Sequence, residues 1–185
     1  MKPYNHTTYA LLGILTTDYR TGYEMKQLID HSLNHFWKIS YGQIYPTLKK
    51  LVQDELATVK TTTQSGKPAR KEYTITDKGR NELLAWLEEP LEHIPAHRNE
   101  VLLKLFFSRH QQPEQTLSLL NDYMDILQRN YDTYEGIEQM ITRCNESPDV
   151  TYWLYTLDYG KRITKATLEW CQVTIEHLKE STDKC

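Results

Sequence analysis

The chain has 185 residues, of which 39% are hydrophobic and 25% are charged, and its net charge is −3. This length suffices for one compact domain with a core, or for a small domain joined to a second one, and we favour two domains. Three widely spaced cysteines argue against a disulfide framework and for a reducing compartment. No apolar run approaches the roughly 20 residues that span a bilayer, and no signal-like segment precedes Tyr4. We therefore expect a cytoplasmic protein with no membrane partner.

Charge is distributed unevenly along the chain. Residues 38–80 carry nine Lys and Arg against four Asp and Glu, a net of +5, whereas residues 81–185 carry ten against eighteen, a net of −8. A basic segment of this kind is typical of a domain that binds nucleic acid. A solvated face without a ligand would account for the same charge, but the basic residues coincide with a helix and a hairpin that would need them.

Two short helices are predicted before the basic segment. The first covers residues 8–15, with Thr7 or Thr8 as its N-cap. Its buried stripe consists of Ala10, Leu11, Ile14 and Leu15. The second follows a turn at residues 18–22 and covers residues 23–32. Its buried side chains are expected to be Tyr23, Met25 or Leu28, and Ile29.

Residues 40–55 are predicted to form a recognition helix, around which the rest of the chain is organised. Ser40 is its expected N-cap. Its apolar residues recur at the spacing of one helix face, so this stripe packs on a core. The stripe consists of Ile44, Leu48, Leu51 and Val52. Five side chains point elsewhere and are the candidates for DNA contact: Tyr41, Gln43, Tyr45, Thr47 and Lys50.

These five candidates are expected to have two different roles. Gln43 is expected to read a base edge, because the carboxamide of Gln can pair with both N6 and N7 of adenine. The other four are expected to position the helix on phosphates, which carry no direct sequence information.

A β-hairpin with a basic tip is predicted after this helix. Residues 57–64 and 69–74 are rich in Thr, Val, Tyr and Ile, which favour strands, and residues 65–68 read Ser-Gly-Lys-Pro, which favours a turn. A helix followed by a basic hairpin indicates a winged helix-turn-helix, whose wing contacts phosphates or a narrow minor groove. The wing residues expected to contact DNA are Lys67, Arg70 and Lys71.

One more helix completes the first domain. It is capped by Thr76 and extends to about Glu89, where Pro90 stops it. Its apolar side consists of Leu83, Leu84, Trp86 and Leu87. We assign residues 1–90 to a winged helix-turn-helix DNA-binding domain and residues 91–185 to an α-helical dimerisation and effector domain.

The second domain is predicted to be entirely helical. A short helix at residues 99–109 has the stripe Val101, Leu102, Leu105 and Phe106. A long helix starting at Gln112-Pro113 has a heptad-like seam of Leu117, Leu120, Met124, Leu127, Tyr131, Tyr134 and Ile141, interrupted by Glu138. The last helix, residues 150–179, has the predicted seam Tyr152, Tyr155, Tyr159, Ile163, Ala166, Trp170, Val173 and His177. Two helices of roughly 30 residues are about 45 Å long and need both each other and a second copy for burial. The predicted fold class is mainly α with a small β-wing.

Catalytic and metal-binding patterns are weak. His93 and His97 have the i, i+4 spacing of metal ligands, but Pro95 lies between them. Cys144 and Cys171 could meet across the last two helices, although buried structural thiols are commoner than reactive ones. No nucleophile with a base, glycine-rich phosphate loop or carboxylate pair stands out. We expect no enzyme, no metal and no cofactor.

Four blocks of sequence, taken together, resemble the PadR family of winged-helix transcriptional regulators. They are residues 10–15 (ALLGIL), 22–25 (GYEM), 43–51 (QIYPTLKKL) and 73–79 (YTITDKG). Pro46 inside the recognition helix is a family feature, and residues 37–87 are similar to the members that respond to phenolic acids. One departure is Glu55-Leu56, where the family usually has a Gly before the first wing strand.

The resemblance implies a homodimeric repressor that binds a palindromic operator and is released by a small aromatic effector such as a phenolic acid. Candidates for the effector pocket are Tyr152, Tyr155, Tyr159 and Arg162, since tyrosines can stack on a phenolic ring and an arginine can bind its carboxylate. A purely structural role for these tyrosines is the alternative. The competing functions are a multidrug-sensing repressor of the same family and a winged-helix module that binds protein and never contacts DNA.

Overall fold

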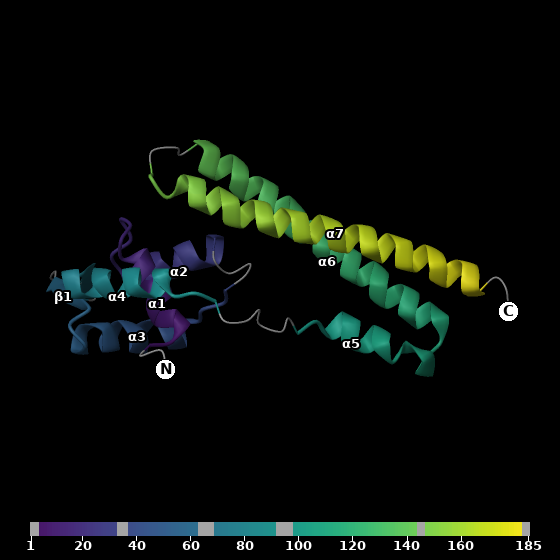
Figure 1. Cartoon of the computed structure of the whole chain (residues 1–185), viewed down its shortest axis with the longest axis horizontal. Helices are drawn as coiled ribbons and strands as arrows, with labels where there is room; N and C mark the ends of the chain where they lie inside the picture. Colours follow the sequence, from purple (N-terminus) through teal and green to yellow (C-terminus); the bar gives the residue numbers. More distant parts are fainter. Residues whose placement is uncertain (1–3, 33–36, 63–68, 92–97, 144–146, 183–185) are drawn as a thin grey trace. The chain divides into compact units, whose positions relative to one another are not determined.

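The structure, a computed structural model, describes residues 4–32, 37–62, 69–91, 98–143 and 147–182 (Figure 1). The chain divides into two compact units, residues 1–94 and residues 95–185. The described elements are helices and one two-stranded antiparallel sheet, so the predicted fold class is confirmed. In the part of the chain that the structure describes, none of the helices has the length and apolar character to cross a membrane.

The first unit is a three-helix core extended by a hairpin and a fourth helix. Its elements are α1 (His6–Ile14), α2 (Gly22–His31), α3 (Tyr41–Gln53), β1 (Ala57–Thr62), β2 (Arg70–Ile75) and α4 (Asp77–Glu88). Helix α3 packs on α1, α2 and β1, and α4 packs on α1. The predicted stripe of α3 is confirmed, since Ile44, Leu48 and Leu51 are fully buried and Val52 is half-buried.

The start of α1 and one side of α2 differ from the sequence prediction. The N-cap of α1 is Asn5, whose Oδ1 accepts a hydrogen bond from the backbone N–H of Thr8 at 2.9 Å. Thr7 and Thr8, the predicted caps, are instead buried in the first turn. Tyr23 is 59% exposed, because Met25 and Ile29 fill the core and a residue two positions before Met25 lies on the other side of the helix.

Tyr9 ties α1 to α4. Its ring stacks on the indole of Trp86, with centroids 4.7 Å apart and planes 5° apart, and its hydroxyl donates to Glu82 at 3.1 Å. Burial, reinforced by this hydrogen bond, raises the pKa of Tyr9 to about 12. Trp86 and Leu83 supply the inward side of α4 as predicted, whereas Leu84 and Leu87 are 55% and 63% exposed.

The connection from α3 to the wing is a Schellman turn centred on Glu55. The N–H of Leu56 donates to the carbonyl of Leu51 at 2.8 Å, and the N–H of Glu55 donates to the carbonyl of Val52 at 3.2 Å. Glu55 has a φ of 61°. Among the residues that the structure describes, it is the one non-glycine residue with a positive φ. This is the position where the resemblance led us to expect glycine, and the strain follows from the Cβ that Glu55 carries.

Replacing Glu55 with glycine should therefore stabilise the first unit. Glu55→Gly removes the Cβ that disfavours the left-handed conformation, and we expect the free energy of unfolding to rise by about 1 kcal/mol. Glu55→Ala is the matched control, since it loses the same exposed ion pair with Lys78 but keeps a Cβ. Urea unfolding in which the Ala variant gains as much stability as the Gly variant would contradict this explanation.

The second unit is built on two long antiparallel helices. It comprises α5 (Glu100–Phe106), the 3-10 turn η2 (Ser108–His110), α6 (Pro113–Arg143) and α7 (Val150–Thr182). Figure 1 shows α6 and α7 side by side along most of their length. The predicted seam of α6 is confirmed: its buried or half-buried residues include Leu117, Leu120, Met124, Leu127, Tyr131, Tyr134 and Ile141.

Glu138, which interrupts this seam in the sequence, has a partner on α7. Lys161 Nζ lies 2.6 Å from Glu138 Oε2, and the Lys161 side chain is only 18% exposed. The hydrogen bond to Glu138 raises the pKa of Lys161 above its usual range. Nearby, a Cβ added at Gly160 would lie 3.4 Å from the ring of Tyr134, an ordinary van der Waals distance. The ion pair of Lys161 with Glu138 and the packing of Tyr134 beside Gly160 therefore favour one register of the two helices.

The predicted seam of α7 does not face α6. The residues that α7 buries are Val150, Leu157, Thr164, Cys171 and Ile175. Most of the predicted seam lies on the opposite side, which we call the outer stripe of α7. Its members and their exposed fractions are Tyr152 69%, Tyr155 67%, Tyr159 67%, Ile163 52% and Val173 50%. Ala166 and His177 are also exposed, and Trp170 is half-buried. Helix α7 has two apolar stripes with the same helical period, and periodicity alone does not say which one faces α6.

Helix α5 is also less buried than predicted. It ends at Phe106, and of its predicted stripe only Val101 and Leu105 are half-buried. Leu102 is 49% exposed and Phe106 82% exposed, because α5 is covered on one side by α6 and is too short to bury a wider stripe.

Candidate nucleic-acid interface

The outer face of α3 presents most of the predicted contact residues together. Tyr41 and Tyr45 are 46% and 49% exposed, and their rings stack at 6.3 Å with planes 13° apart. Gln43 and Lys50 are exposed, and Thr47 is half-buried. Because the apolar stripe of α3 is buried in the core, these polar and aromatic side chains are held on the solvent side. Side chains of these types can contact phosphates and base edges in a major groove.

Gln43 has a structural role as well as an exposed position. As the third residue of α3, it accepts hydrogen bonds at Oε1 from the Ser40 N–H at 3.0 Å and from the Ser40 hydroxyl at 3.1 Å. Such a bond satisfies a backbone donor at the start of the helix. Because its Oε1 is held by Ser40, the bond constrains where the carboxamide of Gln43 can lie.

The cations around α3 are arranged over aromatic rings. Lys50 Nζ lies 5.3 Å from the centre of the Tyr4 ring, and Lys26 Nζ lies 5.5 Å from the centre of the Tyr41 ring. Lys26 also pairs with Asp30. Lys50 has no carboxylate partner within the described ranges, so its charge remains available to an external anion.

The structure describes two of the three predicted contact residues of the wing, Arg70 and Lys71. In the sheet, Thr62 pairs with Arg70 and Thr61 with Lys71, so both basic residues lie toward the turn end of the hairpin. Arg70 forms ion pairs with Glu24 at 3.1 Å and with Glu72 at 3.0 Å. Lys71 is exposed and has no ion pair with any described carboxylate. Lys67 lies outside the described residues.

A groove separates α2, α3 and the wing. It has a volume of ≈ 390 Å³ and is lined by Thr21, Gly22, Tyr23, Glu24, Tyr45, Ala69, Arg70, Lys71 and Tyr73. Tyr45 lies against the start of α2 so closely that a Cβ on Gly22 would come within 2.7 Å of its ring. The sequence prediction missed Tyr23 and Tyr73 as groove residues.

The predicted effector residues lie on the outer stripe of α7 or beside it. The rings of Tyr152 and Tyr155 meet edge to face at 6.3 Å, while Tyr159 is 67% exposed. Arg162 is exposed and pairs with Asp158 at 2.7 Å. A pocket made from these four residues would need another surface to close it.

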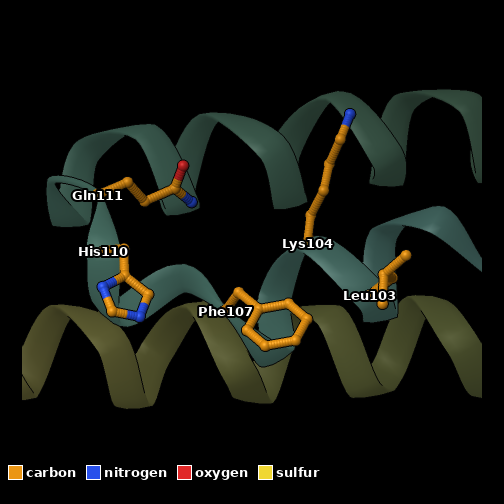
Figure 2. Close-up of a pocket in the computed structure, with 5 residues that line it drawn as sticks. All are labelled: Leu103, Lys104, Phe107, His110 and Gln111. Carbon is orange, nitrogen blue, oxygen red and sulfur yellow. The ribbon is translucent and has the colours of Figure 1, made fainter.

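A shallow cavity lies at the end of α5, away from these residues. It has a volume of ≈ 360 Å³, and Figure 2 shows its lining side chains, Leu103, Lys104, Phe107, His110 and Gln111, on α5 and the turn that follows. Its apolar side is formed by Leu103 and Phe107, which are 62% and 57% exposed.

No metal-binding group is formed by the residues that the structure describes. His93, His97 and Cys144 lie outside those residues. Cys171 is fully buried between α6 and α7, and this burial raises the pKa of its thiol, as expected for a structural cysteine.

Comparison with known proteins identifies the family. The model described as the transcriptional regulator PadR-like family matches residues 11–85, and the model described as virulence activator alpha C-term matches residues 97–179. The negative transcriptional regulator PadR of Bacillus subtilis is 31% identical over 154 residues, which are 79% of this chain and 83% of that protein. The chain belongs to the PadR-like family of transcriptional regulators. The predictions of the family and of a regulator rather than an enzyme are therefore confirmed.

Two solved structures are similar to this PadR-like regulator over nearly its whole length. Bacillus subtilis PadR in complex with operator DNA superposes with a TM-score of 0.83 at 27% identity and covers 94% of this chain and 99% of that chain. Bacillus subtilis PadR in complex with p-coumaric acid superposes with a TM-score of 0.77 at 25% identity and covers 93% and 98%. The second unit of this PadR-like regulator thus has the same kind of fold as the C-terminal part of those proteins.

The contact between Gly22 and Tyr45 predicts an energetic coupling. Gly22→Ala places a methyl group against the Tyr45 ring. It should therefore lower the free energy of unfolding more in the wild-type background than in the Tyr45→Ala background, and the difference between the two effects should be about 0.5–3 kcal/mol. The control is Gly42→Ala, whose Cβ would lie 3.7 Å from its nearest neighbour, the Ser40 hydroxyl oxygen. Thermal unfolding should show no coupling between positions 42 and 45. Equal coupling at positions 22 and 42 would contradict the contact.

Proposed function

We propose that this PadR-like regulator is a cytoplasmic repressor that binds a palindromic operator as a homodimer and is released by a small aromatic acid. The observation that carries the proposal is the outward face of α3 beside a basic wing. It occurs in a fold that superposes with a TM-score of 0.83 on Bacillus subtilis PadR bound to operator DNA. An enzyme would need a catalytic constellation, whereas a winged-helix regulator needs only a helix that enters the major groove and cations that hold it there.

In this proposal the contact residues divide by chemistry. Tyr41, Tyr45, Thr47 and Lys50 position α3 on phosphates, and Lys71 and Lys67 bring the wing to the backbone. Gln43 reads a base edge. Lys49, which is also exposed, adds charge on the same helix. Sequence preference therefore depends on very few side chains, and affinity depends on many.

The role of Gln43 can be tested by base preference. Gln43→Ala should relax the preference at one base position per half-site, where an adenine contact is worth about 1–3 kcal/mol of discrimination. Ser40→Ala is the control, since it removes one donor to Gln43 but leaves the carboxamide in place. Ser40→Ala should weaken all operator variants alike. Competition assays in which Gln43→Ala also weakens every sequence equally would contradict the base contact.

The proposed dimer uses the outer stripe of α7. Three tyrosines, Ile163 and Val173 leave a line of apolar surface in water along a helix of 33 residues. Surfaces of this kind on soluble proteins are usually covered by a partner. A second copy can cover it by symmetry, because a two-fold interface needs only one self-complementary patch. The dimer would hold two recognition helices about 34 Å apart, as successive major-groove faces require.

A charge in the middle of the outer stripe should break the dimer. Ile163→Lys should give a monomer in analytical ultracentrifugation, because one lysine from each copy would be buried against the other. Gln172→Lys is the control, since residue 172 is exposed on a different side of α7 and should leave the dimer intact. A stable Ile163→Lys dimer with the wild-type dissociation constant would place the interface elsewhere.

The proposed effector is a phenolic acid of the p-coumaric type. The support is the p-coumaric acid complex of a protein with the same fold and 25% identity, together with the tyrosines and Arg162 on α7. These residues offer ring faces, hydroxyl groups and a guanidinium. Because these residues are exposed in one chain, a second surface would have to close the pocket. Binding of the effector would then change the position of that second surface.

Effector release can be measured by mobility shift. p-Coumaric acid should release the operator at concentrations where benzoate does not, since the ligand must favour the non-binding conformation by several kcal/mol. Arg162→Gln should weaken the response without weakening operator binding. A complex that ignores every hydroxycinnamic acid but responds to a cationic drug would instead indicate a multidrug sensor.

The competing protein-interaction function is tested by salt. Binding to random duplex should weaken as salt rises, since each phosphate contact releases counterions. Absence of any duplex binding at low salt would favour the protein-interaction module.

A further inference from the structure

The first turn of α2 carries a carboxylate that is fixed on one side by backbone donors. Glu24 Oε2 accepts from the N–H of Thr21 at 2.9 Å and from the N–H of Arg20 at 3.0 Å. In return, the Thr21 hydroxyl accepts from the N–H of Glu24 at 3.2 Å. Burial alone would raise the pKa of Glu24, but these bonds and Arg70 outweigh it and hold the pKa below its usual range. The Glu24 carboxylate is therefore ionised at neutral pH and has a defined position.

Its other oxygen meets the wing. Glu24 Oε1 accepts from Nη2 of Arg70 at 3.1 Å, and Nε of the same guanidinium forms an ion pair with Glu72 Oε1 at 3.0 Å. Arg70 is the first residue of β2 and pairs with Thr62, at the end of the hairpin that is nearest the turn. The guanidinium thus bridges the start of α2 and the outer end of the described wing.

A second tie joins the same elements closer to the base of the hairpin. The N–H of Tyr73 donates to the carbonyl of Arg20 at 2.8 Å, and Nη1 of Arg20 donates to the carbonyl of Leu15 at 2.9 Å. One tie alone would act as a pivot, about which the hairpin could swing. Two ties three residues apart on β2 fix its direction relative to α2, and through the contact of Tyr45 with Gly22 they fix it relative to α3.

We propose that the pair Glu24–Arg70 is a strut that sets the angle between the wing and the recognition helix, and that Arg70 is a positioning residue and not a phosphate contact. This proposal rests on the proposed DNA-binding function. It replaces the expectation from sequence that Arg70 binds phosphate, because a guanidinium shared by two carboxylates presents little net charge to a third anion. Lys71, which has no carboxylate partner among the residues described, is left as the phosphate contact of β2.

The test uses Glu24→Gln, Arg70→Gln, the double variant and Lys71→Gln, all in the full chain. Gln at position 24 can still complete the capping box, so this change removes the charge and spares the helix start. Glu24→Gln should weaken operator binding about twofold to fivefold for each wing, the range of an exposed ion pair, although it removes a negative charge near DNA. The double variant should bind no more weakly than Arg70→Gln alone.

The salt dependence separates positioning from phosphate contact. Arg70→Gln and Glu24→Gln should leave the slope of log affinity against log salt unchanged, whereas Lys71→Gln should reduce it by about 0.9 for each lost contact. Tighter operator binding by Glu24→Gln, or a slope for Arg70→Gln that falls as far as that for Lys71→Gln, would overturn the strut. A wild-type protein whose duplex binding ignores salt would instead refute the DNA-binding function itself, so the two failures are distinguishable.

Discussion

Burial of one stripe of α3 determines what this protein can present to a partner. Ile44, Leu48 and Leu51 are fully buried against the other helices of the first unit, and each such aliphatic side chain contributes roughly 1.5–3 kcal/mol of burial free energy. This fixes the rotation of α3 about its own axis. Tyr41, Gln43, Tyr45 and Lys50 then face solvent because the helical period leaves them no other side. The contact surface is therefore organised before a partner arrives, and binding need not order it.

The turn at residues 20–24 contacts both elements that we propose bind DNA, α3 and the wing. Gly22 has no side chain, so the ring of Tyr45 on α3 can lie directly against it. Glu24 and the carbonyl of Arg20 hold β2 at two points. Small movements of this turn would displace the recognition helix and the wing together. Their relative geometry, which in the proposed function has to match a groove and the adjacent phosphates, is thus set by contacts within the first unit.

The sequence predicts those parts of this architecture in which a single helical or strand periodicity is carried by residues of one chemical type. The stripe of α3 alternates cleanly with polar residues, the wing strands are rich in β-formers, and the seam of α6 has one apolar side. Helix α7 could not be oriented in this way, because aromatic residues form one stripe while Leu157, Cys171 and Ile175 form another, and the choice depends on contacts with α6. Tyr23 was misplaced for a similar reason, since Met25 and Ile29 already fill the core.

Ion pairs between distant segments were the least predictable feature. Basic residues in a predicted wing favour phosphate contact, and only the structure shows that Arg70 lies between Glu24 and Glu72. Likewise, the sequence shows Glu138 only as an interruption of the apolar seam of α6, and the structure shows that it pairs with Lys161 of α7. Residues separated by 46 and 23 positions were brought together by folding, and neither helical nor strand periodicity encodes such a pairing.

In the proposed function, two copies of this chain read DNA sequence through α3. The most direct test is selection of binding sites from a random duplex library by the full-length protein. We expect enrichment of a two-fold symmetric site whose half-sites are centred a whole number of helical turns apart, about 10–10.5 base pairs or a multiple of this. Enrichment of no sequence, or of a single asymmetric half-site, would contradict it.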